Sequence, residues 1–236
     1  MKKPKIKEGQ SLSYLRWFWW FIWEDNSIYS WVANILLAFV LIKFIVYPGL
    51  GFILATSHPI VAVVSGSMEH KIQYDCTALG QTCEKKNLNL CGLSFEAKEQ
   101  INFDKYWRYC GRWYELRGIE KNDFEKYSFK NGFNKGDIIV LLGKNPKDLK
   151  IGDVIVFWTE TRAEPIIHRA IFINETANGL LFTTKGDHNG RSDSVIDTDI
   201  REDNIIGKAY FRIPYLGYIK IWFVEMFLFI KNIIGV

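Results

Sequence analysis

The sequence predicts a mainly β fold, in which a membrane-anchored β-domain follows one N-terminal transmembrane helix and carries a cysteine-containing insertion. Three observations predict it: an apolar run over 28–54, short Val-, Ile- and Phe-rich runs between turn residues further on, and four cysteines within 70–135. With 236 residues, the chain has room for one folded domain of about 150–180 residues besides its membrane-associated ends. A net charge of +4 is too small to indicate a nucleic-acid partner.

The N-terminal part consists of a short aromatic segment and a longer apolar one. Residues 14–23 within the 1–27 segment are rich in Trp and Phe but too few to cross a bilayer, which is typical of an interfacial segment. The run 28–54 contains a single charged residue, Lys43, and about 20 apolar residues are enough to span the hydrocarbon core. This run is too long and too far from the N-terminus for a cleavable signal peptide, so we expect a retained transmembrane anchor.

Basic residues predict the orientation of that anchor. The twenty residues after Leu54 contain only Lys71, whereas several basic residues precede the span: Lys2, Lys3, Lys5, Lys7 and Arg16. The positive-inside rule then places the N-terminus in the cytoplasm and the chain after about residue 55 outside.

Beyond the anchor, residues 55–212 show the pattern of an antiparallel β-domain. Gly-Asp, Asn-Gly and Asn-Pro turns separate runs rich in β-branched and aromatic residues. The predicted strands are 60–65, 137–142, 153–158, 166–173, 180–184 and 205–212.

Residues 70–135 are expected to form an insertion or small subdomain within this domain. They contain Cys76, Cys83, Cys91 and Cys110, and an even number of cysteines outside the cytoplasm predicts up to two disulfides, with three possible pairings. Zinc binding is the weaker alternative, because no Cys-x-x-Cys occurs. The segment is either a substrate-handling or membrane-touching surface or a solvated excursion with its own small core.

The C-terminal segment 213–236 is apolar, but Lys220, Glu225 and Lys231 interrupt it. Its longest uncharged piece is too short to span a bilayer. We therefore expect an amphipathic helix on the outer leaflet rather than a second crossing.

Three motifs carry candidate chemistry. They are Ser65-Gly-Ser67-Met-Glu69, then Ile166-Ile-His168-Arg169, then Lys185-Gly-Asp187-His-Asn189 followed by Asp193. Each alone has an ordinary structural explanation, since Gly and Ser are common in turns and a lone His is often buried and satisfied. In this order they supply the three parts of a Ser-His-Asp device.

The ordered set resembles the type I signal peptidases, in the branch found in archaea and the endoplasmic reticulum. The stretch 59–69 looks like the family's nucleophile box, and 136–140 looks like the strand box after it. The bacterial branch has Lys where this chain has His168, and 185–193 is similar to the acidic box of the His-dependent branch. Gly207 and 213–217 resemble the closing box. The chain departs from the family at His70, where a proline would stiffen the turn.

The resemblance implies a role for each site residue. Ser67 is expected to be the nucleophile, His168 the general base, and Asp193 the carboxylate that orients the imidazole. Asp187 resembles a second acidic position, with a structural role or a role in the same network. The Ser65 hydroxyl and the Ser67 backbone N–H would stabilise the oxyanion. We expect Arg169 to be a surface or packing charge and His188 to be solvated.

The implied function is a membrane-bound serine endopeptidase that removes signal peptides from exported preproteins at the membrane surface, with no cofactor and no metal. Its expected partners are preproteins, the lipid bilayer and the export translocon, with no nucleic acid. The expected location is the cell membrane, or the endoplasmic reticulum membrane in a eukaryote. Two alternatives remain: a specialised peptidase of the same fold that acts on a narrow class of exports, and a catalytically silent membrane-anchored scaffold that binds exported chains.

Overall fold

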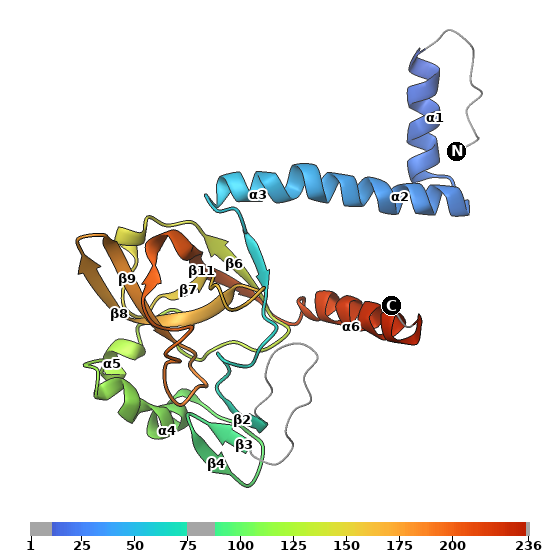
Figure 1. Cartoon of the computed structure of the whole chain (residues 1–236). Helices are drawn as coiled ribbons and strands as arrows, with labels where there is room; N and C mark the ends of the chain where they lie inside the picture. Colours follow the sequence, from blue (N-terminus) through green and yellow to red (C-terminus); the bar gives the residue numbers. More distant parts are fainter. Residues whose placement is uncertain (1–10, 75–87, 235–236) are drawn as a thin grey trace. The chain divides into compact units, whose positions relative to one another are not determined.

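The computed structural model describes residues 11–74 and 88–234 and divides into two compact units. The first unit ends at Ile53 and the second begins at Leu54. Figure 1 shows the elements of both units along the chain.

The first unit is helical. Helix α1 (Ser11–Trp23) is followed by a short turn and helix α2 (Ile28–Leu41). Ser27 caps α2, because its hydroxyl accepts a hydrogen bond from the Ser30 backbone N–H. The Ser30 hydroxyl in turn donates to the Phe21 carbonyl at 2.6 Å, which ties the start of α2 to the end of α1.

One helix runs without a break from Ile28 to Ile53, through α2, a π-helical turn (Ile42–Val46) and α3 (Tyr47–Ile53). Pro48 has no backbone N–H to donate, and the wider π turn just before it is the kind of irregularity that admits such a residue inside a helix. This helix has 26 residues, which corresponds to about 39 Å at 1.5 Å per residue. Within the described residues it is the one helix long and apolar enough to cross a membrane, and it lies where the transmembrane anchor was expected.

A curled seven-stranded sheet forms the frame of the second unit. Its strand order is β1-β6-β11-β7-β8-β9-β10, and every pair of neighbours is antiparallel. The strands are β1 (Ile60–Ala62), β6 (Ile138–Leu142), β7 (Val154–Phe157), β8 (Ile166–Thr176), β9 (Gly179–Lys185), β10 (Ile200–Arg201) and β11 (Ile205–Ile213). Two 3-10 turns, Pro146–Asp148 and Glu202–Asn204, connect them. The mainly β fold is confirmed.

The side chains of strand β8 point alternately to the two faces of this sheet, as successive side chains of a strand do. Ile166 and Ala170 belong to one apolar cluster, with Phe157 and Phe182. Ile167 belongs to another, with Met68 and several residues of β6 and β7. His168 and Arg169 are therefore presented to opposite faces of the same strand.

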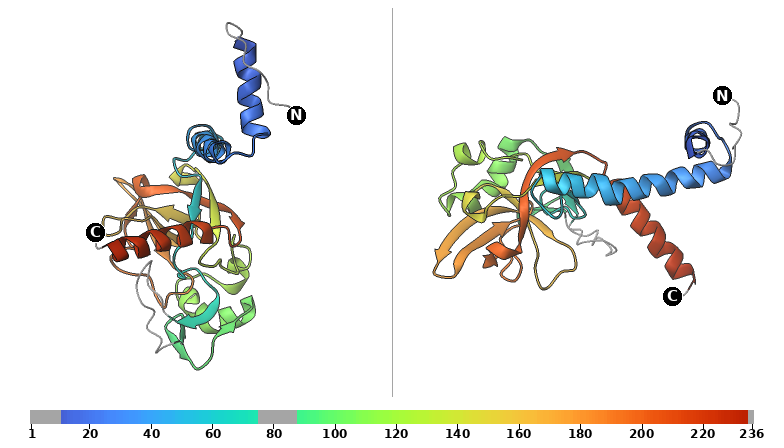
Figure 2. Two further views of the ribbon diagram at one scale, coloured as in Figure 1. Left: turned by 90° about the vertical axis from the view of Figure 1, so that its right-hand side faces the viewer. Right: turned by 90° about the horizontal axis from the view of Figure 1, so that it is seen from above.

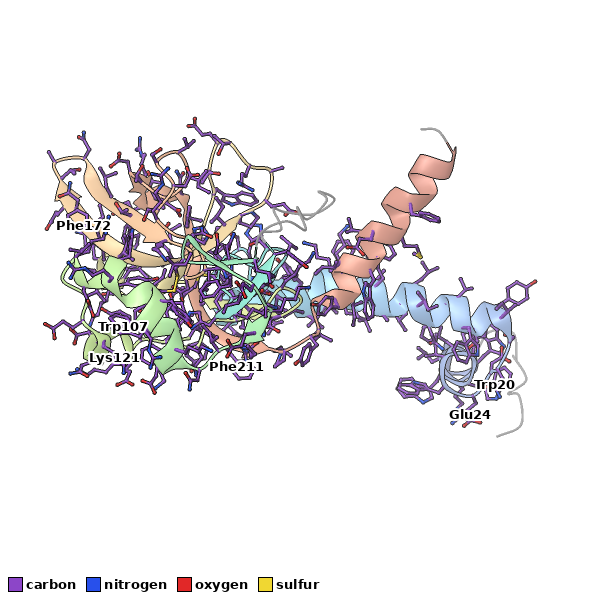
Figure 3. The ribbon with its side chains drawn as sticks, turned by 90° about the horizontal axis from the view of Figure 1, so that it is seen from below. Trp20, Glu24, Trp107, Lys121, Phe172 and Phe211 are labelled. Atoms are coloured by element: carbon purple, nitrogen blue, oxygen red, sulfur yellow. A yellow bond between two sulfur atoms is a disulfide. The ribbon has the colours of Figure 1, made fainter. Side chains whose placement is uncertain are left out.

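The insertion has a fold of its own beside this sheet (Figure 2). A small sheet has the order β4-β3-β2-β5, and helix α4 (Phe103–Glu115) and helix α5 (Lys121–Phe124) accompany it. Its strands are β2 (Lys71–Tyr74), β3 (Leu88–Leu90), β4 (Leu93–Phe95) and β5 (Glu99–Gln100). Trp107 of α4 (labelled in Figure 3) belongs to an aromatic core, in which its ring centroid lies 5.4 Å from that of Phe124 of α5.

A disulfide joins Cys91, at the turn between β3 and β4, to Cys110 on α4. Closing a loop of this length stabilises the folded state by about 3 kcal/mol in the chain-entropy model. One of the expected disulfides is therefore found, and the zinc alternative fails for these two cysteines because their sulfurs are bonded to each other. Cys76 and Cys83 lie outside the described residues.

Helix α6 (Tyr218–Ile234) ends the described chain. Ile221 is buried, whereas Ile219, Trp222 and Phe223 are exposed. An apolar helix is thus found where the amphipathic C-terminal segment was expected, and its place on a membrane stays a prediction.

Candidate active site

The turn that carries Ser67 follows β1 directly. The chain continues the β1–β6 pairing as far as Val63, whose N–H donates to the Asp137 carbonyl at 2.8 Å. It then turns sharply, and the buried Met68 side chain anchors the turn in the core. A Cβ on Gly66 would lie 2.5 Å from Gln73 Nε2, so only glycine fits beside the nucleophile without displacing a neighbour.

His168 reaches this turn from the middle of β8. Its Nε2 lies 3.0 Å from Ser67 Oγ, and its ring is buried. The separation of 101 residues along the chain is bridged by the sheet. The two residues expected to be nucleophile and base therefore lie within hydrogen-bond distance of each other.

The carboxylate against the other ring nitrogen belongs to Asp197, not to Asp193. Asp197 Oδ1 lies 2.6 Å from His168 Nδ1. Asp193 instead stabilises the turn that presents Asp197: its Oδ1 accepts from the Val195 N–H at 2.8 Å, and its own N–H donates to Asp197 Oδ2 at 2.9 Å. The assignment of Asp193 as the residue in contact with the imidazole is corrected accordingly.

Asp197 is held as an ionised acceptor. The Thr184 hydroxyl donates to its Oδ1 at 2.7 Å, in addition to the bonds described above. Burial by itself would raise the pKa of Asp197, but the charge and hydrogen bond of His168 and the hydrogen bonds from Asp193 and Thr184 outweigh burial and lower it. The carboxylate is thus negative and fixed in orientation, as an imidazole partner requires.

Ser65 lies beside the nucleophile as the resemblance implied. Its hydroxyl oxygen is 3.2 Å from Ser67 Oγ. A hydroxyl at this distance is placed to donate to an oxygen that forms next to Ser67.

Asp187 is fully buried and lies in a separate ionic cluster. Arg169, also fully buried, binds it in a bidentate manner, with Nε at 2.9 Å from Oδ1 and Nη2 at 2.6 Å from Oδ2. His70 Nε2 lies 3.1 Å from Oδ2. Burial would raise the pKa of Asp187, but Arg169 and His70 lower it far below its usual value. Removing one member of such a pair costs about 3–5 kcal/mol, since the other charge is left buried.

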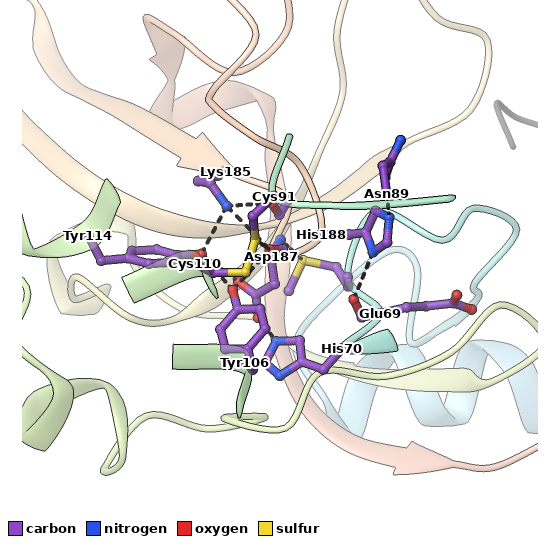
Figure 4. The surroundings of a disulfide bond; sticks show 12 residues. Glu69, His70, Asn89, Cys91, Tyr106, Cys110, Tyr114, Lys185, Asp187 and His188 are labelled. Atoms are coloured by element: carbon purple, nitrogen blue, oxygen red, sulfur yellow. Dashed lines mark hydrogen bonds and ion pairs between the residues drawn. A yellow bond between two sulfur atoms is a disulfide. The ribbon is translucent and has the colours of Figure 1, made fainter. Parts of the chain in front are cut away.

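The insertion supplies most of the other contacts of this cluster, as Figure 4 shows. Tyr114 of α4 donates to Asp187 Oδ1 at 3.2 Å, and Tyr106 donates to the Asp187 carbonyl at 2.9 Å. The His70 ring stacks on Tyr106 with centroids 3.5 Å apart. Arg169, expected to be a surface or packing charge, has a packing role: its guanidinium joins the sheet to the insertion.

Lys185 is the second buried cation here. It pairs with Arg169 across β8 and β9, so both side chains lie on the same face. Its Nζ donates to the Gly186 carbonyl at 3.0 Å and to Tyr114 Oη at 3.3 Å. Burial lowers the pKa of Lys185 to about 7, although the nearby Asp187 opposes this.

The loop 185–190 joins this cluster to the nucleophile. A Cβ on Gly186 would lie 2.8 Å from both His168 Nε2 and the Ser67 carbonyl oxygen. The His188 N–H donates to that same Ser67 carbonyl at 2.8 Å. His188 is buried, with its Nε2 2.9 Å from Asn89 Oδ1 of β3, so the expectation that it is solvated is wrong.

A cleft of about 240 Å³ opens above Ser67 and His168. One wall is the stretch 61–64 of β1 and its extension, and another is the start of β8 at 165–167. Gln73, Tyr74, His188 and Asn189 also line it. Ser67, His168 and Asp197 together form a hydrogen-bonded relay, and Ser67 and His168 line this cleft.

Several of these residues carry no sequence signal strong enough to identify them. Asp197 lies in a segment with other aspartates at 187, 193 and 199, and spacing alone does not rank them. Thr184 immediately precedes the Lys-Gly-Asp motif. Because side chains alternate along a strand, Thr184 is expected on the same face of β9 as the buried Phe182. The pairing of His70 and Tyr106 with Asp187 depends on the fold of the insertion.

Comparison with known proteins agrees with the resemblance that the motifs indicated. The chain is 35% identical over 105 residues to the signal peptidase complex catalytic subunit SEC11 of Lachancea thermotolerans, covering 42% of this chain and 62% of that protein. It is 31% identical over 99 residues to the subunit SEC11C of Homo sapiens, covering 40% of this chain and 52% of that protein. A similar subunit of Zygosaccharomyces rouxii is 31% identical over 104 residues.

The chain thus spans between 52% and 62% of the length of these curated relatives. No protein-family model matches it. The resemblance to catalytic subunits of signal peptidases is confirmed at this level of identity.

Proposed function

We propose that this protein is a membrane-anchored serine endopeptidase that removes signal peptides from exported preproteins. The observation that carries the proposal is the relay from Ser67 through His168 to Asp197, with distances of 3.0 and 2.6 Å, at the floor of a cleft. The similarity to signal peptidase catalytic subunits supports the same activity.

The geometry supports acyl transfer by a serine nucleophile. Ser67 Oγ attacks the scissile carbonyl carbon while its proton passes to His168 Nε2, and Asp197 stabilises the resulting imidazolium. The C–N bond then breaks, and the same proton passes from Nε2 to the leaving amine. A water molecule, deprotonated by His168, hydrolyses the ester and frees Ser67.

The oxyanion formed in both steps needs hydrogen-bond donors close to Ser67. The Ser65 hydroxyl, 3.2 Å from Ser67 Oγ, and the Ser67 backbone N–H are the donors that we assign to it. Loss of one such donor typically costs about 3–4 kcal/mol of transition-state stabilisation.

The cleft suits an extended peptide with small apolar side chains. β1 is an edge strand, paired on one side by β6, so its other side is free to pair with the backbone of a substrate strand. Val61, Val63 and Ile166 provide apolar walls. Signal peptides carry small residues near the cut after an apolar stretch, and such residues fit the apolar side of the cleft.

The helix Ile28–Ile53 fits a single-pass membrane anchor. From the basic residues before it, we place the N-terminus in the cytoplasm and the catalytic domain outside, at the cell membrane or, in a eukaryote, in the endoplasmic reticulum. The relatives are named as subunits of a signal peptidase complex, and this supports further subunits as partners. The preproteins, the bilayer and the export translocon are the partners that we infer from the sequence motifs.

The test is cleavage of a model preprotein by the detergent-solubilised full chain, with N-terminal sequencing of the product. Ser67→Ala should keep the protein in the membrane and remove nearly all cleavage, because no other group replaces the attacking oxygen. Ser94→Ala, at an exposed position of β4, is the matched control and should cleave like wild type.

The outcomes separate the alternatives. Cleavage by Ser67→Ala at the wild-type rate would exclude the mechanism, and absence of cleavage by wild type would favour the silent scaffold. Survival of ordinary precursors while one class of export is cut would favour a specialised peptidase of the same fold.

A further inference from the structure

The insertion contributes one wall of the cleft through its strand β2. Gln73 and Tyr74 of this strand line the cleft together with Ser65, Gly66 and Ser67. Ile72 is buried in the insertion's aromatic core, and strand alternation therefore presents Gln73 on the opposite face. A segment outside the larger sheet thus brings a polar side chain to the nucleophile turn.

The Gln73 carboxamide lies against this turn. Its Nε2 would be 2.5 Å from a Cβ on Gly66, the residue immediately before Ser67. The neighbouring polar side chain on the same face of β2, Lys71, is already paired with Glu69 at 2.9 Å. None of the hydrogen bonds found among the described residues uses the Gln73 carboxamide, so its two N–H donors and its carbonyl are available to a ligand in the cleft.

The lining of the cleft differs between its parts. Apolar side chains come from β1, its extension and the start of β8: Val61, Val63, Val64, Ile166 and Ile167. Polar and charged side chains come from the residues just before β8, from β2 and from the stretch after β9: Arg162, Glu164, Gln73, His188, Asn189 and Asp193. Small apolar residues precede the cut in a signal peptide, so the apolar part suits the signal peptide and the polar part suits the residues after the cut.

Residues after the cut belong to many different mature proteins and share only their backbone. A neutral carboxamide can donate to a backbone carbonyl whatever the side chain is. A charged residue in this place would favour or reject particular mature sequences.

We propose that Gln73 is a substrate-binding residue that donates a hydrogen bond to a backbone carbonyl among the second to fifth residues after the scissile bond. This inference rests on the proposed peptidase function. It gives the insertion a direct part in substrate recognition at the side of the mature protein.

The experiment compares two synthetic peptides in cleavage by the detergent-solubilised full chain. Both contain the same residues before the cut; the short one ends as an amide after one mature residue, and the long one continues for four more. Gln73→Met keeps the length of the side chain and removes its donors. It should lower kcat/KM for the long peptide about fivefold to tenfold, the usual value of one hydrogen bond, and leave the short peptide within about twofold.

Two further variants sharpen the result. Gln73→Glu also removes the donors and should give the same selective loss, and it tests the proposal if the methionine variant does not fold. Asn178→Asp makes the same carboxamide-to-carboxylate change in the exposed hairpin between β8 and β9 and should cleave both peptides like wild type.

Three results would overturn the inference. Equal kcat/KM for wild type and both Gln73 variants would show that the carboxamide does not contact substrate. Equal loss for both peptides, at the hundredfold scale of an oxyanion donor, would assign Gln73 to another role. Absence of any Ser67-dependent cleavage in wild type would instead remove the proposed function on which the inference rests.

Discussion

Replacing Asp197 with Asn tests the relay most directly. Asp197 Oδ1 accepts from His168 Nδ1, and Oδ2 accepts from the Asp193 N–H at 2.9 Å. An asparagine has one acceptor oxygen and one donor nitrogen, so in either orientation its NH₂ group meets one of these donors. If it meets His168, the imidazole must shift its proton to Nε2 and can no longer accept the proton of Ser67.

The expected loss in kcat is about 10⁴-fold, the value found when the same change is made in a serine protease triad. This corresponds to about 5.4 kcal/mol in the activation free energy. The assay is cleavage of a peptide that spans a signal-peptide cut, with thermal unfolding measured on the same samples to show that the variant is folded.

Asp193→Asn is the matched control, with the same chemical change four residues away. Asp193 Oδ1 accepts from the Val195 and Ile196 N–H groups at 2.8 and 3.3 Å, and an asparagine oxygen can do the same. We therefore expect kcat within about threefold of wild type, whereas the resemblance alone assigns the larger loss to Asp193. A dead Asp193→Asn beside a fully active Asp197→Asn would refute the geometric argument.

Two further predictions concern the loop that joins the relay to the ionic cluster. Gly186→Ala should lower kcat about 100-fold, because its Cβ would lie 2.8 Å from His168 Nε2 and a displacement of about 1 Å is costly. Gly49→Ala, where a Cβ meets nothing within 4 Å, should keep full activity, and equal kcat in both variants would contradict the packing argument. Lys185→Met should change how stability depends on pH. The pKa of Lys185 is about 7 in the folded protein, against an ordinary value of 10.5, so between these pH values the unfolded chain binds more protons than the folded one. As the pH rises through this range, wild type gains up to about 1.4 kcal/mol of stability per pH unit relative to the variant. Denaturant unfolding of the full chain at pH 7, 8 and 9, followed by a spectroscopic signal from the β-domain, measures this difference. Parallel plots of stability against pH for wild type and variant would show that Lys185 stays protonated in the folded state.

The sequence was sufficient to predict the apolar helix and the strands of the larger sheet except the two-residue β10, because these elements follow from local patterns. The predicted strand 166–173 lies inside β8, and the predicted span 28–54 differs from the helix Ile28–Ile53 by one residue. The insertion was predicted only as an extra segment with disulfides. Its helix and sheet order depend on an aromatic core that assembles from residues of separated elements, and no short motif encodes it.

The sequence motifs predicted only part of the candidate site. The structure brings Ser67 and His168 within hydrogen-bond distance of each other, and each stands in a motif whose neighbours restrict its role. The third member was assigned to the wrong aspartate, because a turn of four residues brings Asp197 to the imidazole while Asp193 supports that turn. Because both candidates are aspartates, residue type cannot distinguish Asp193 from Asp197. The backbone geometry of the turn decides which of the two carboxylates reaches the imidazole.

The insertion and the relay depend on each other through Asp187. Its carboxylate binds Arg169, the neighbour of the base on β8, and its carbonyl accepts from Tyr106 of α4. The adjacent residues Gly186 and His188 contact the base and the nucleophile's backbone. Because fully buried charges are costly when one partner moves, any displacement of α4 that withdraws Tyr106 or Tyr114 from Asp187 would also shift the loop beneath Ser67. The disulfide between Cys91 and Cys110 joins α4 to the turn after β3, and the Cys91 N–H donates to the His188 carbonyl at 2.8 Å. The insertion is therefore part of the structure that holds Ser67 and His168 in position relative to each other.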